Sequence, residues 1–235
     1  MSSFYKWLEE EDYIIKSPMK RIHRIKSPVV IKPAFTEEQI EVIRKSAVDN
    51  LRNLTIVDFD DVDITNINRQ IPALHSTVGK LKVEVMRDRI LDINPDINIK
   101  AICEKYNKET SDKILVEDYD YVVDAIDMVT SKIHLIETCK NKGMDIISSM
   151  GMGNKLDPTK IEVTDIHKTT ICPLARVMRK ELKDRRIKKL KVVYSTEQPA
   201  ELKKKIFNGK KITPGSISFV PSVGGLIIAS VVIND

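Results

Sequence analysis

One stretch, residues 54–70, constrains the fold of this chain more than any other. It begins with an apolar run at residues 54–57, which predicts a buried strand. Carboxylates, amides and a guanidinium follow directly: Asp58, Asp60, Asp61, Asp63, Asn66, Asn68, Arg69 and Gln70. A buried strand that ends in such groups is typical of a nucleotide site at the carboxyl end of a parallel strand.

The segment before this stretch completes a predicted βαβ unit. Residues 29–32 read as a short strand that Pro33 ends, and Thr36 is a candidate cap for an amphipathic helix at residues 37–53. With the strand at 54–57 they form a unit in which the two strands are normally parallel and joined by a right-handed crossover.

The same alternation continues to the end of the chain. We expect helices at residues 81–94, 108–115, 130–142, 173–186 and 222–233, the last capped by Ser222, and strands at residues 98–105, 119–127, 144–149, 160–166, 192–195 and 216–220. Residues 160–166 alternate apolar and polar side chains, as in a sheet with one exposed face. The fold class is therefore α/β: a doubly wound, Rossmann-like, mostly parallel sheet with antiparallel C-terminal additions. Residues 1–28 are poorly patterned, and residues 29–235 are expected to form a single domain.

Length and cysteine content exclude several classes of protein. A chain of 235 residues suffices for one sizeable α/β domain. Cys103, Cys139 and Cys172 form no CxxC pair, which argues against a disulfide framework and a four-thiolate zinc site. No apolar run is long enough to span a bilayer. We expect a cytoplasmic protein without a membrane partner.

The net charge of +5 is concentrated in three basic clusters, at residues 20–26, 183–191 and 203–211. Such clusters can neutralise phosphates, so they fit a polyanionic partner. They fit a solvated surface equally well, and the composition leaves both interpretations open.

The polar cluster after residue 57 supplies five candidate nucleotide-binding residues. Asp58 lies about 20 residues beyond the first predicted turn, the spacing at which an acidic side chain binds ribose hydroxyls. Asn66, Arg69, Gln70 and Lys82 are suited to phosphate oxygens, with arginine as a planar fork and lysine as a point charge. The alternatives are a solvated acidic loop for Asp58 and ordinary surface for the other four.

A second candidate site follows the strand at residues 119–127. Asp127 stands at its carboxyl end, where a carboxylate can hold magnesium on the phosphates of a nucleotide; the alternative is a helix N-cap. Asp124, still within the strand, is expected to have a structural hydrogen-bonding role. Cys172 is expected in an exposed segment before Pro173, without a base beside it to make it a nucleophile.

These residues coincide with motifs of a known family. The strings are TIVDFDDVDITNINRQ (55–70), GKLKVE (79–84), INP (93–95) and DAID (124–127). They resemble the ubiquitin-activating-type (ThiF/MoeB-like) adenylating family. Within it, LDPTKIEVTD (156–165), PLA (173–175) and GSISFVPS (215–222) are similar to the tRNA threonylcarbamoyladenosine dehydratase (TcdA/CsdL-like) branch. The resemblance runs from about residue 53 to the end.

The resemblance implies an ATP-dependent ligase-type enzyme that activates a carboxylate. Asp58 would hold the ribose of ATP, and Asn66, Arg69, Gln70 and Lys82 would surround its phosphates. Asp127 would bind Mg²⁺, and Arg69, Lys82 and Asp127 would carry the catalysis.

The same resemblance implies the substrate and the partners. In the dehydratase branch the activated group is the threonine carboxylate of threonylcarbamoyladenosine in tRNA, which cyclises with loss of water. The partners implied are tRNA, a second copy of the chain in a homodimer, and a sulfur-relay protein. No zinc is expected, because the zinc-binding sulfur-carrier branch uses two CxxC pairs that are absent here.

One segment departs from the family pattern. The family has a glycine-rich loop between its first strand and helix, whereas residues 33–38 contain no glycine and include Glu37 and Glu38. Glycines there let the backbone approach phosphate. Two alternative functions therefore stay open: a tRNA- or protein-binding module that has lost ATP binding, and activation of a ubiquitin-like sulfur carrier.

Overall fold

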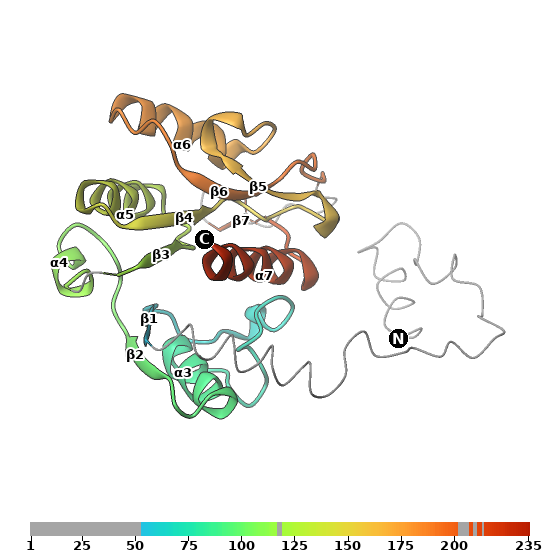
Figure 1. Ribbon diagram of the computed structural model, residues 1–235. Coiled ribbons are helices and arrows are strands. Elements are labelled where there is room, and N and C mark those ends of the chain that lie inside the picture. Colours follow the sequence, from blue (N-terminus) through green and yellow to red (C-terminus); the bar gives the residue numbers. More distant parts are fainter. Residues whose placement is uncertain (1–52, 117–118, 202–206, 209–210, 213) are drawn as a thin grey trace, which may run out of the picture.

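The computed structural model describes residues 53–116, 119–201, 207–208, 211–212 and 214–235. The predicted strand at 29–32, the helix at 37–53 and the glycine-free segment at 33–38 lie outside the described residues. The described part contains two groups of strands with their helices (Figure 1). Within it, no helix is long and apolar enough to cross a membrane.

The first group is a parallel pair of strands joined by one helix. Strand β1 (Asn53–Val57) leads through the polar stretch to helix α3 (Lys82–Ile93), and β2 (Asn98–Ile102) returns beside β1 with Asn53 opposite Asn98 and Val57 opposite Ile102. Both strands therefore end at the same edge, where the polar stretch begins.

The second group is a four-stranded sheet in the order β3-β4-β6-β5. Strands β3 (Tyr121–Asp124), β4 (Asp145–Ser149) and β6 (Lys191–Ser195) are parallel, and β5 (Ile161–Asp165) pairs antiparallel with β6. This mixture confirms the predicted α/β fold with antiparallel C-terminal additions.

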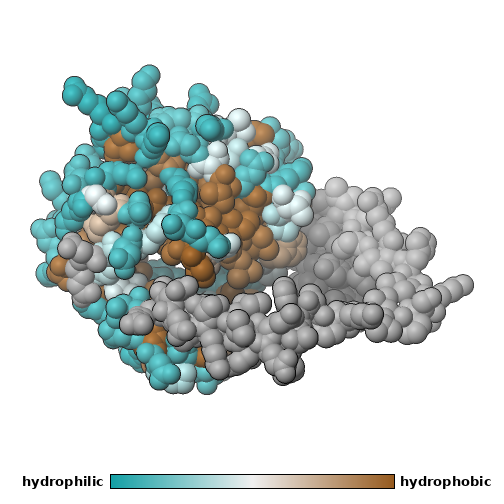
Figure 2. Space-filling view, in the orientation of Figure 1, coloured by the Kyte–Doolittle hydropathy of each residue, from teal (hydrophilic) through white to brown (hydrophobic). Residues whose placement is uncertain are grey.

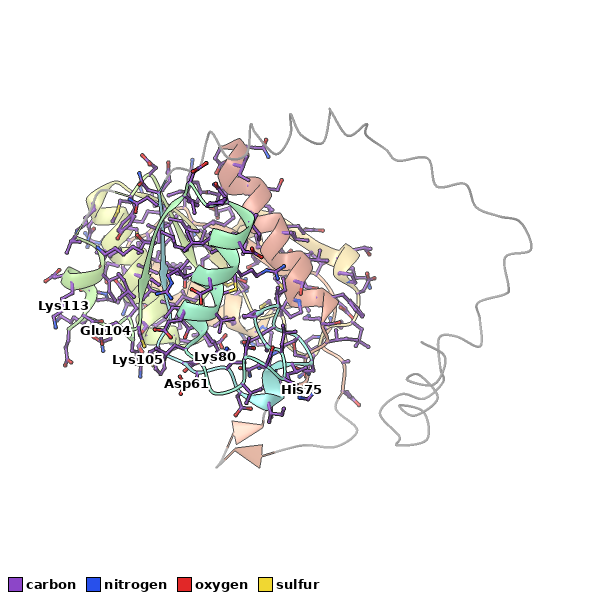
Figure 3. All side chains as sticks on the ribbon, turned by 90° about the horizontal axis from the view of Figure 1, so that it is seen from below. Asp61, His75, Lys80, Glu104, Lys105 and Lys113 are labelled. Carbon is purple, nitrogen blue, oxygen red and sulfur yellow. The ribbon has the colours of Figure 1, made fainter. Side chains whose placement is uncertain are left out.

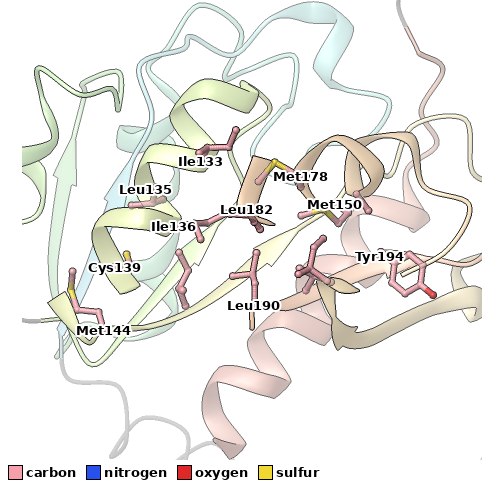
Figure 4. Packing of buried hydrophobic residues seen from close by; sticks show 14 of the residues in the cluster. Ile133, Leu135, Ile136, Cys139, Met144, Met150, Met178, Leu182, Leu190 and Tyr194 are labelled. Atoms are coloured by element: carbon pink, nitrogen blue, oxygen red, sulfur yellow. The ribbon is translucent and has the colours of Figure 1, made fainter. Parts of the chain in front are cut away.

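Helices cover both faces of this sheet (Figure 1). Helices α5 (Val129–Lys142) and α6 (Pro173–Asp184) lie on one face, and α7 (Phe219–Asn234) lies on the other. Adjacent strand residues point to opposite faces, so Ile146 packs under α5 and α6 while Ile147 packs under α7. The larger core, between the sheet and α5 and α6, is shown in Figure 4 and includes Ile136, Cys139, Met178, Leu182 and Leu190.

Short elements connect these layers. They are the 3-10 turns η2 (Ile64–Asn66), η3 (Pro158–Lys160) and η4 (Ile166–Lys168), the single-turn helix α4 (Ser111–Ile114), and the hairpin strands β7 (Phe207–Asn208) and β8 (Lys211–Ile212).

The prediction was wrong in one place, residues 216–222. No strand forms there; α7 begins at Phe219, and Ser222 lies inside it with its hydroxyl donating to the carbonyl of Ser218 at 2.6 Å. Pro221 indicated a boundary, but proline is tolerated in the first turn of a helix because the amide it lacks has no partner there. Gly143, by contrast, ends α5 as expected, in the left-handed conformation at φ 74°.

Candidate functional site

The loop after β1 is fixed against the start of α3. The amide of Val62 donates to the carbonyl of Lys80 at 2.8 Å, and the amide of Lys82 donates to that of Asp60 at 3.0 Å. Val62 is buried beneath the loop, and the Asp58 carboxylate accepts from the amide of Asp60 at 2.9 Å. A single buried valine thus anchors a loop of carboxylates beside the first turn of α3.

Lys82 is the first residue of α3 and is already paired. Its ammonium lies 2.8 Å from the carboxylate of Asp60, and 13% of its side chain is exposed against 49% for Asp60. Asp60 therefore neutralises Lys82 in this structure, beside the positive end of the α3 dipole.

Asn66 is buried because its side chain completes a capping box. The carboxylate of Asp63 accepts from the amide of Thr65 at 2.8 Å and from its hydroxyl at 2.6 Å, and these bonds lower the pKa of Asp63. In return the amide of Asp63 donates to Oδ1 of Asn66 at 3.1 Å. The side-chain NH₂ of Asn66 is therefore the part of this residue that can reach a ligand.

Arg69 is held in place on one side of its guanidinium. Nη1 donates to the carbonyl of Thr65 and to Oδ1 of Asn68, both at 3.0 Å, and Nδ2 of Asn68 donates to the carbonyl of Ser216 at 3.2 Å. The contacts with described residues all use Nη1, so Nε and Nη2 remain for a phosphate. Gln70 follows in the same turn, with its amide donating to the carbonyl of Asn66 at 2.9 Å.

Residues that follow β2 reach the same edge. Figure 3 shows Asp61 and Lys80 of the loop together with Glu104 and Lys105, which follow β2, along one side of the molecule. The ammonium of Lys105 lies 5.6 Å from the ring centroid of Phe59. The carboxyl edge of the β1–β2 pair therefore carries charged side chains of both signs.

The end of β3 contains a fully buried ion pair. Asp124 and Ser148 are opposite each other in the β3–β4 register, and Lys132 reaches them from the first turn of α5. The ammonium of Lys132 lies 2.8 Å from Oδ2 of Asp124, 3.1 Å from Oγ of Ser148 and 2.9 Å from the carbonyl of Ser149, and the hydroxyl of Ser148 donates to the same carboxylate at 2.6 Å. The side chains of Asp124 and Lys132 have 0% exposure. The structural role predicted for Asp124 is confirmed, whereas Lys132 was not predicted.

Asp127 lies in the turn that this ion pair supports. The amide of Ile126 donates to Oδ1 of Asp124 at 3.1 Å, which fixes the turn, and Asp127 projects from it exposed. The N-cap of α5 is Met128, so the alternative interpretation of Asp127 as the cap was wrong. Within the described part of the chain nothing hydrogen-bonds or ion-pairs with the Asp127 carboxylate.

The loop after β4 contains Gly151 and Gly153 but is fixed by hydrogen bonds. Asn154 adopts a left-handed conformation, φ 57°; its amide donates to the carbonyl of Gly215 at 2.8 Å and its Oδ1 accepts from the amide of Gly215 at 2.6 Å. Lys155 is 2% exposed and donates to the carbonyl of Glu197, and burial lowers its pKa. No pattern in the sequence marks Lys155 as a buried lysine.

Cys172 is a correction to the sequence prediction. It lies 2% exposed immediately before α6, because the start of that helix packs on the sheet, rather than in an exposed segment. His134 is paired as well: its Nδ1 lies 3.0 Å from the hydroxyl of Tyr106, and burial raises the pKa of Tyr106 to about 12.

Five of the six predicted site residues lie on the stretch that runs from the end of β1 to the first residue of α3: Asp58, Asn66, Arg69, Gln70 and Lys82. The sixth, Asp127, lies in the turn after β3. Among the described residues, no hydrogen bond or ion pair joins Asp127 to the other five. In that part of the chain no three His, Cys, Asp or Glu side chains are grouped so as to hold a metal ion.

Comparisons with known proteins place these features in a family. The family model described as "ThiF family" matches residues 42–233. A Bacillus subtilis protein, tRNA threonylcarbamoyladenosine dehydratase, is 42% identical over 206 residues, which cover 83% of this chain and 80% of that protein. The protein of the same name from Escherichia coli is 41% identical over 130 residues, 55% of this chain and 48% of its own length.

A solved structure agrees with the sequence comparisons. The crystal structure of the E. coli tRNA N6-threonylcarbamoyladenosine dehydratase TcdA in complex with ATP superposes with a TM-score of 0.71 at 30% identity, covering 81% of this chain and 79% of that one. The family model covers most of the chain, and its first matched residue, 42, lies beyond the glycine-free segment at 33–38. The chain belongs to the ThiF family.

Proposed function

We propose that the chain is an ATP-dependent tRNA threonylcarbamoyladenosine dehydratase. The observation that carries this proposal is the match to the B. subtilis dehydratase, 42% identity over four fifths of that protein. The fold is similar over a comparable share of the E. coli structure that contains ATP. The polar stretch between β1 and α3 supplies the groups that such a reaction requires.

The reaction proceeds in two steps. The threonine carboxylate of the substrate attacks the α-phosphorus of ATP, and pyrophosphate leaves with the electrons of the broken P–O bond. A nucleophilic atom of the same side chain then attacks the activated acyl carbon, and AMP and a proton leave. The substrate loses the elements of one water, which end up in AMP and pyrophosphate.

Each residue of the loop has an assigned role in this proposal. Asp58 accepts hydrogen bonds from the ribose hydroxyls, and Arg69 presents Nε and Nη2 to phosphate oxygens while Asn68 and Thr65 hold Nη1. Lys82 leaves Asp60 and pairs with a phosphate oxygen as negative charge develops on the leaving pyrophosphate, and the positive end of the α3 dipole stabilises the same charge. Asn66 and Gln70 offer side-chain NH₂ groups to the same oxygens.

Asp127 is the proposed magnesium ligand. Its carboxylate is exposed and, within the described residues, without a cationic partner. Mg²⁺ is commonly held by one or two carboxylates together with substrate phosphates and waters, so a single carboxylate beside a nucleotide fits this ion. The ion would neutralise phosphate charge, and the buried Asp124–Lys132 pair would keep the turn that presents Asp127 in place.

We propose that α7 contributes to a homodimer interface. This helix is apolar on all sides, and Leu226 and Ile233 are 68% and 55% exposed on it. Hydrophobic atoms gather on the face shown in Figure 2. Large exposed apolar patches mark interfaces. Leu226→Glu, compared with the polar surface change Lys140→Glu, is expected to lower the molar mass measured by light scattering towards that of one chain.

A second candidate function is a tRNA-binding module that does not bind ATP. It is favoured by one feature, the absence of glycine from residues 33–38, where two glutamates stand instead. Tight ATP binding measured by calorimetry eliminates this candidate. The predicted sulfur-relay partner and the cytoplasmic location follow from the family resemblance and from tRNA as substrate, and stay predictions.

The test is a dehydration assay on tRNA that carries threonylcarbamoyladenosine. Purified protein, ATP and Mg²⁺ are incubated with this tRNA, and the nucleosides are measured by mass spectrometry. ATP-dependent loss of one water from the modified nucleoside, with AMP and pyrophosphate formed in equal amounts, supports the proposal. Loss of water without ATP, or ATP use without loss of water, contradicts it.

A further inference from the structure

Helix α6 has one buried side and one strongly basic side. Ala175, Met178 and Leu182 are buried in the larger core. Arg176, Lys180 and Lys183 are exposed, and their spacing of i, i+4 and i+7 aligns them along one flank of the helix. With a rise of 1.5 Å per residue, this line of charge extends about 10 Å along α6.

The connection from α6 to β6 extends this line. Arg186, Lys188 and Lys189 are exposed in it, and Arg186 adopts a left-handed turn, φ 60°. The "basic strip" is defined as these six exposed residues: Arg176, Lys180, Lys183, Arg186, Lys188 and Lys189. Hydrophilic side chains cover the region of α6 at the top of Figure 2.

The charge of the basic strip is not neutralised within the described residues. The six side chains make no ion pair there, although a neighbouring arginine, Arg185, does pair with carboxylates. Arg185, which lies between them in sequence, is 2.8 Å from Glu181 and 3.7 Å from Glu137. Asp184 is the one exposed acid within residues 176–189. Like charges that gather on one face without partners repel one another and so lower the stability of the fold. Binding of an external polyanion therefore explains the strip better than a contribution to stability.

The basic strip begins near the carboxyl edge of the sheet. Gly151, two residues after β4, lies against the start of α6, since a Cβ placed on it would be 3.9 Å from the Cβ of Leu174. Asp124 ends β3, the parallel neighbour of β4, and Asp127 follows it, so both lie at the same edge. The strip therefore leads from the side of the candidate site towards the opposite end of the sheet.

We infer that the basic strip binds the phosphate backbone of tRNA and so positions the modified nucleoside at the site. This inference rests on the proposed function. Lysine and arginine contacts to phosphates fix the register of a nucleic acid and carry little sequence information, which suits an enzyme that acts on one nucleoside within a large folded RNA. A stem can contact a line of this length while its loop reaches past the start of α6 to the carboxyl edge of the sheet.

The experiment compares two variants that each lose two positive charges from a helix. Lys180→Gln/Lys183→Gln removes two members of the strip, and Arg87→Gln/Arg89→Gln removes two cations from α3, on the other group of strands. Binding of tRNA bearing threonylcarbamoyladenosine is measured by fluorescence anisotropy over a range of salt concentrations. Each phosphate contact contributes about 0.7 to 0.9 to the slope of log K against log salt.

For the strip variant we expect the slope to fall by about 1.4 to 1.8, and Kd at 0.1 M salt to rise about 25- to 60-fold, if affinities converge near 1 M salt. The α3 variant is expected to change Kd less than threefold. In the dehydration assay the strip variant should show a raised KM for tRNA with kcat retained. Equal weakening in both variants, or an unchanged slope in the strip variant, overturns the inference. A wild-type protein that binds tRNA through the strip but forms no dehydrated nucleoside overturns the proposed function alone.

Discussion

Replacing Lys132 by methionine tests whether the buried ion pair at the end of β3 acts as the structure indicates. Methionine has a similar volume but no charge, so Asp124 keeps its burial and loses its cation. Lys132 supplies three of the contacts in this cluster, to Asp124, Ser148 and the carbonyl of Ser149. The carboxylate then retains only the hydroxyl of Ser148 at 2.6 Å and the amide of Ile126 at 3.1 Å.

The expected loss of stability is large because both charges have 0% exposure. Breaking a buried pair by removing one partner costs about 3–5 kcal/mol, since an uncompensated charge stays in the interior. This is a factor of about 10² to 10⁴ in the folding equilibrium. Adding Asp124→Asn removes that charge; the single amide oxygen can still accept from the amide of Ile126, and the NH₂ group can donate to the hydroxyl oxygen of Ser148. The double variant should recover at least half of the loss.

Urea denaturation followed by circular dichroism gives the free energies of unfolding. Lys140→Met is the matched control, on the same helix but exposed, and it should change stability by less than about 0.5 kcal/mol. If Lys132→Met costs less than about 1 kcal/mol, or if the double variant is less stable than Lys132→Met, the pair does not hold the turn as described.

Further predictions concern the turn after β3, the start of α3 and the loop after β4. Asp127→Asn should leave the melting temperature unchanged but abolish the stabilisation given by Mg²⁺ together with ATP, measured by thermal shift; retained stabilisation would exclude Asp127 as a ligand. Lys82→Met should lower the dehydration rate at saturating tRNA by about 10²-fold or more while the fold persists, as checked by circular dichroism; an unchanged rate would remove Lys82 from the catalytic set. Burial lowers the pKa of Lys155 in the folded protein, so between that lowered pKa and 10.5 the unfolded chain binds more protons than the folded one. Over this pH range the wild type should gain stability relative to Lys155→Met as the pH rises; the opposite slope in urea titrations would refute the burial of Lys155. Gly153→Ala would place a Cβ 2.8 Å from a proline side chain and should cost about 1–3 kcal/mol, whereas Gly225→Ala, with open space in α7, should not destabilise; equal effects in urea titrations would contradict this packing.

Local patterns were sufficient to predict most regular elements of the described chain. Strand β1, helix α5 and strand β4 lie within about two residues of their predicted positions, because hydrophobic period and end signals are written in adjacent residues. The failure at residues 216–222 has a local cause as well. A proline fits both the end of a strand and the first turn of a helix. Only the position of α7 against the sheet shows that Pro221 belongs to a first helical turn.

The chemistry of the polar residues was less predictable than the elements that carry them. The motifs singled out Asp58, Arg69 and Asp127 as groups that could meet a nucleotide. They did not show that Asp60 neutralises Lys82, because that pair joins residues 22 positions apart through a loop folded over Val62. Nor did they show the link from Asn68 to Ser216, which spans 148 positions.

The sequence by itself determined that a strand opens into carboxylates, amides and an arginine, and its motifs were specific enough to identify the family; the burial predicted for that strand was wrong, since β1 is exposed at both ends and partly buried between them. Those properties depend on the order of neighbouring residues. The tertiary structure alone decided which of the charged groups are used up within the protein. Lys132 and Asp124 neutralise each other in the core, Lys155 is buried, and Asp127 and the basic strip remain exposed. The reason is physical: the energy of a charge depends on its burial and on its distance from other charges, and folding sets both.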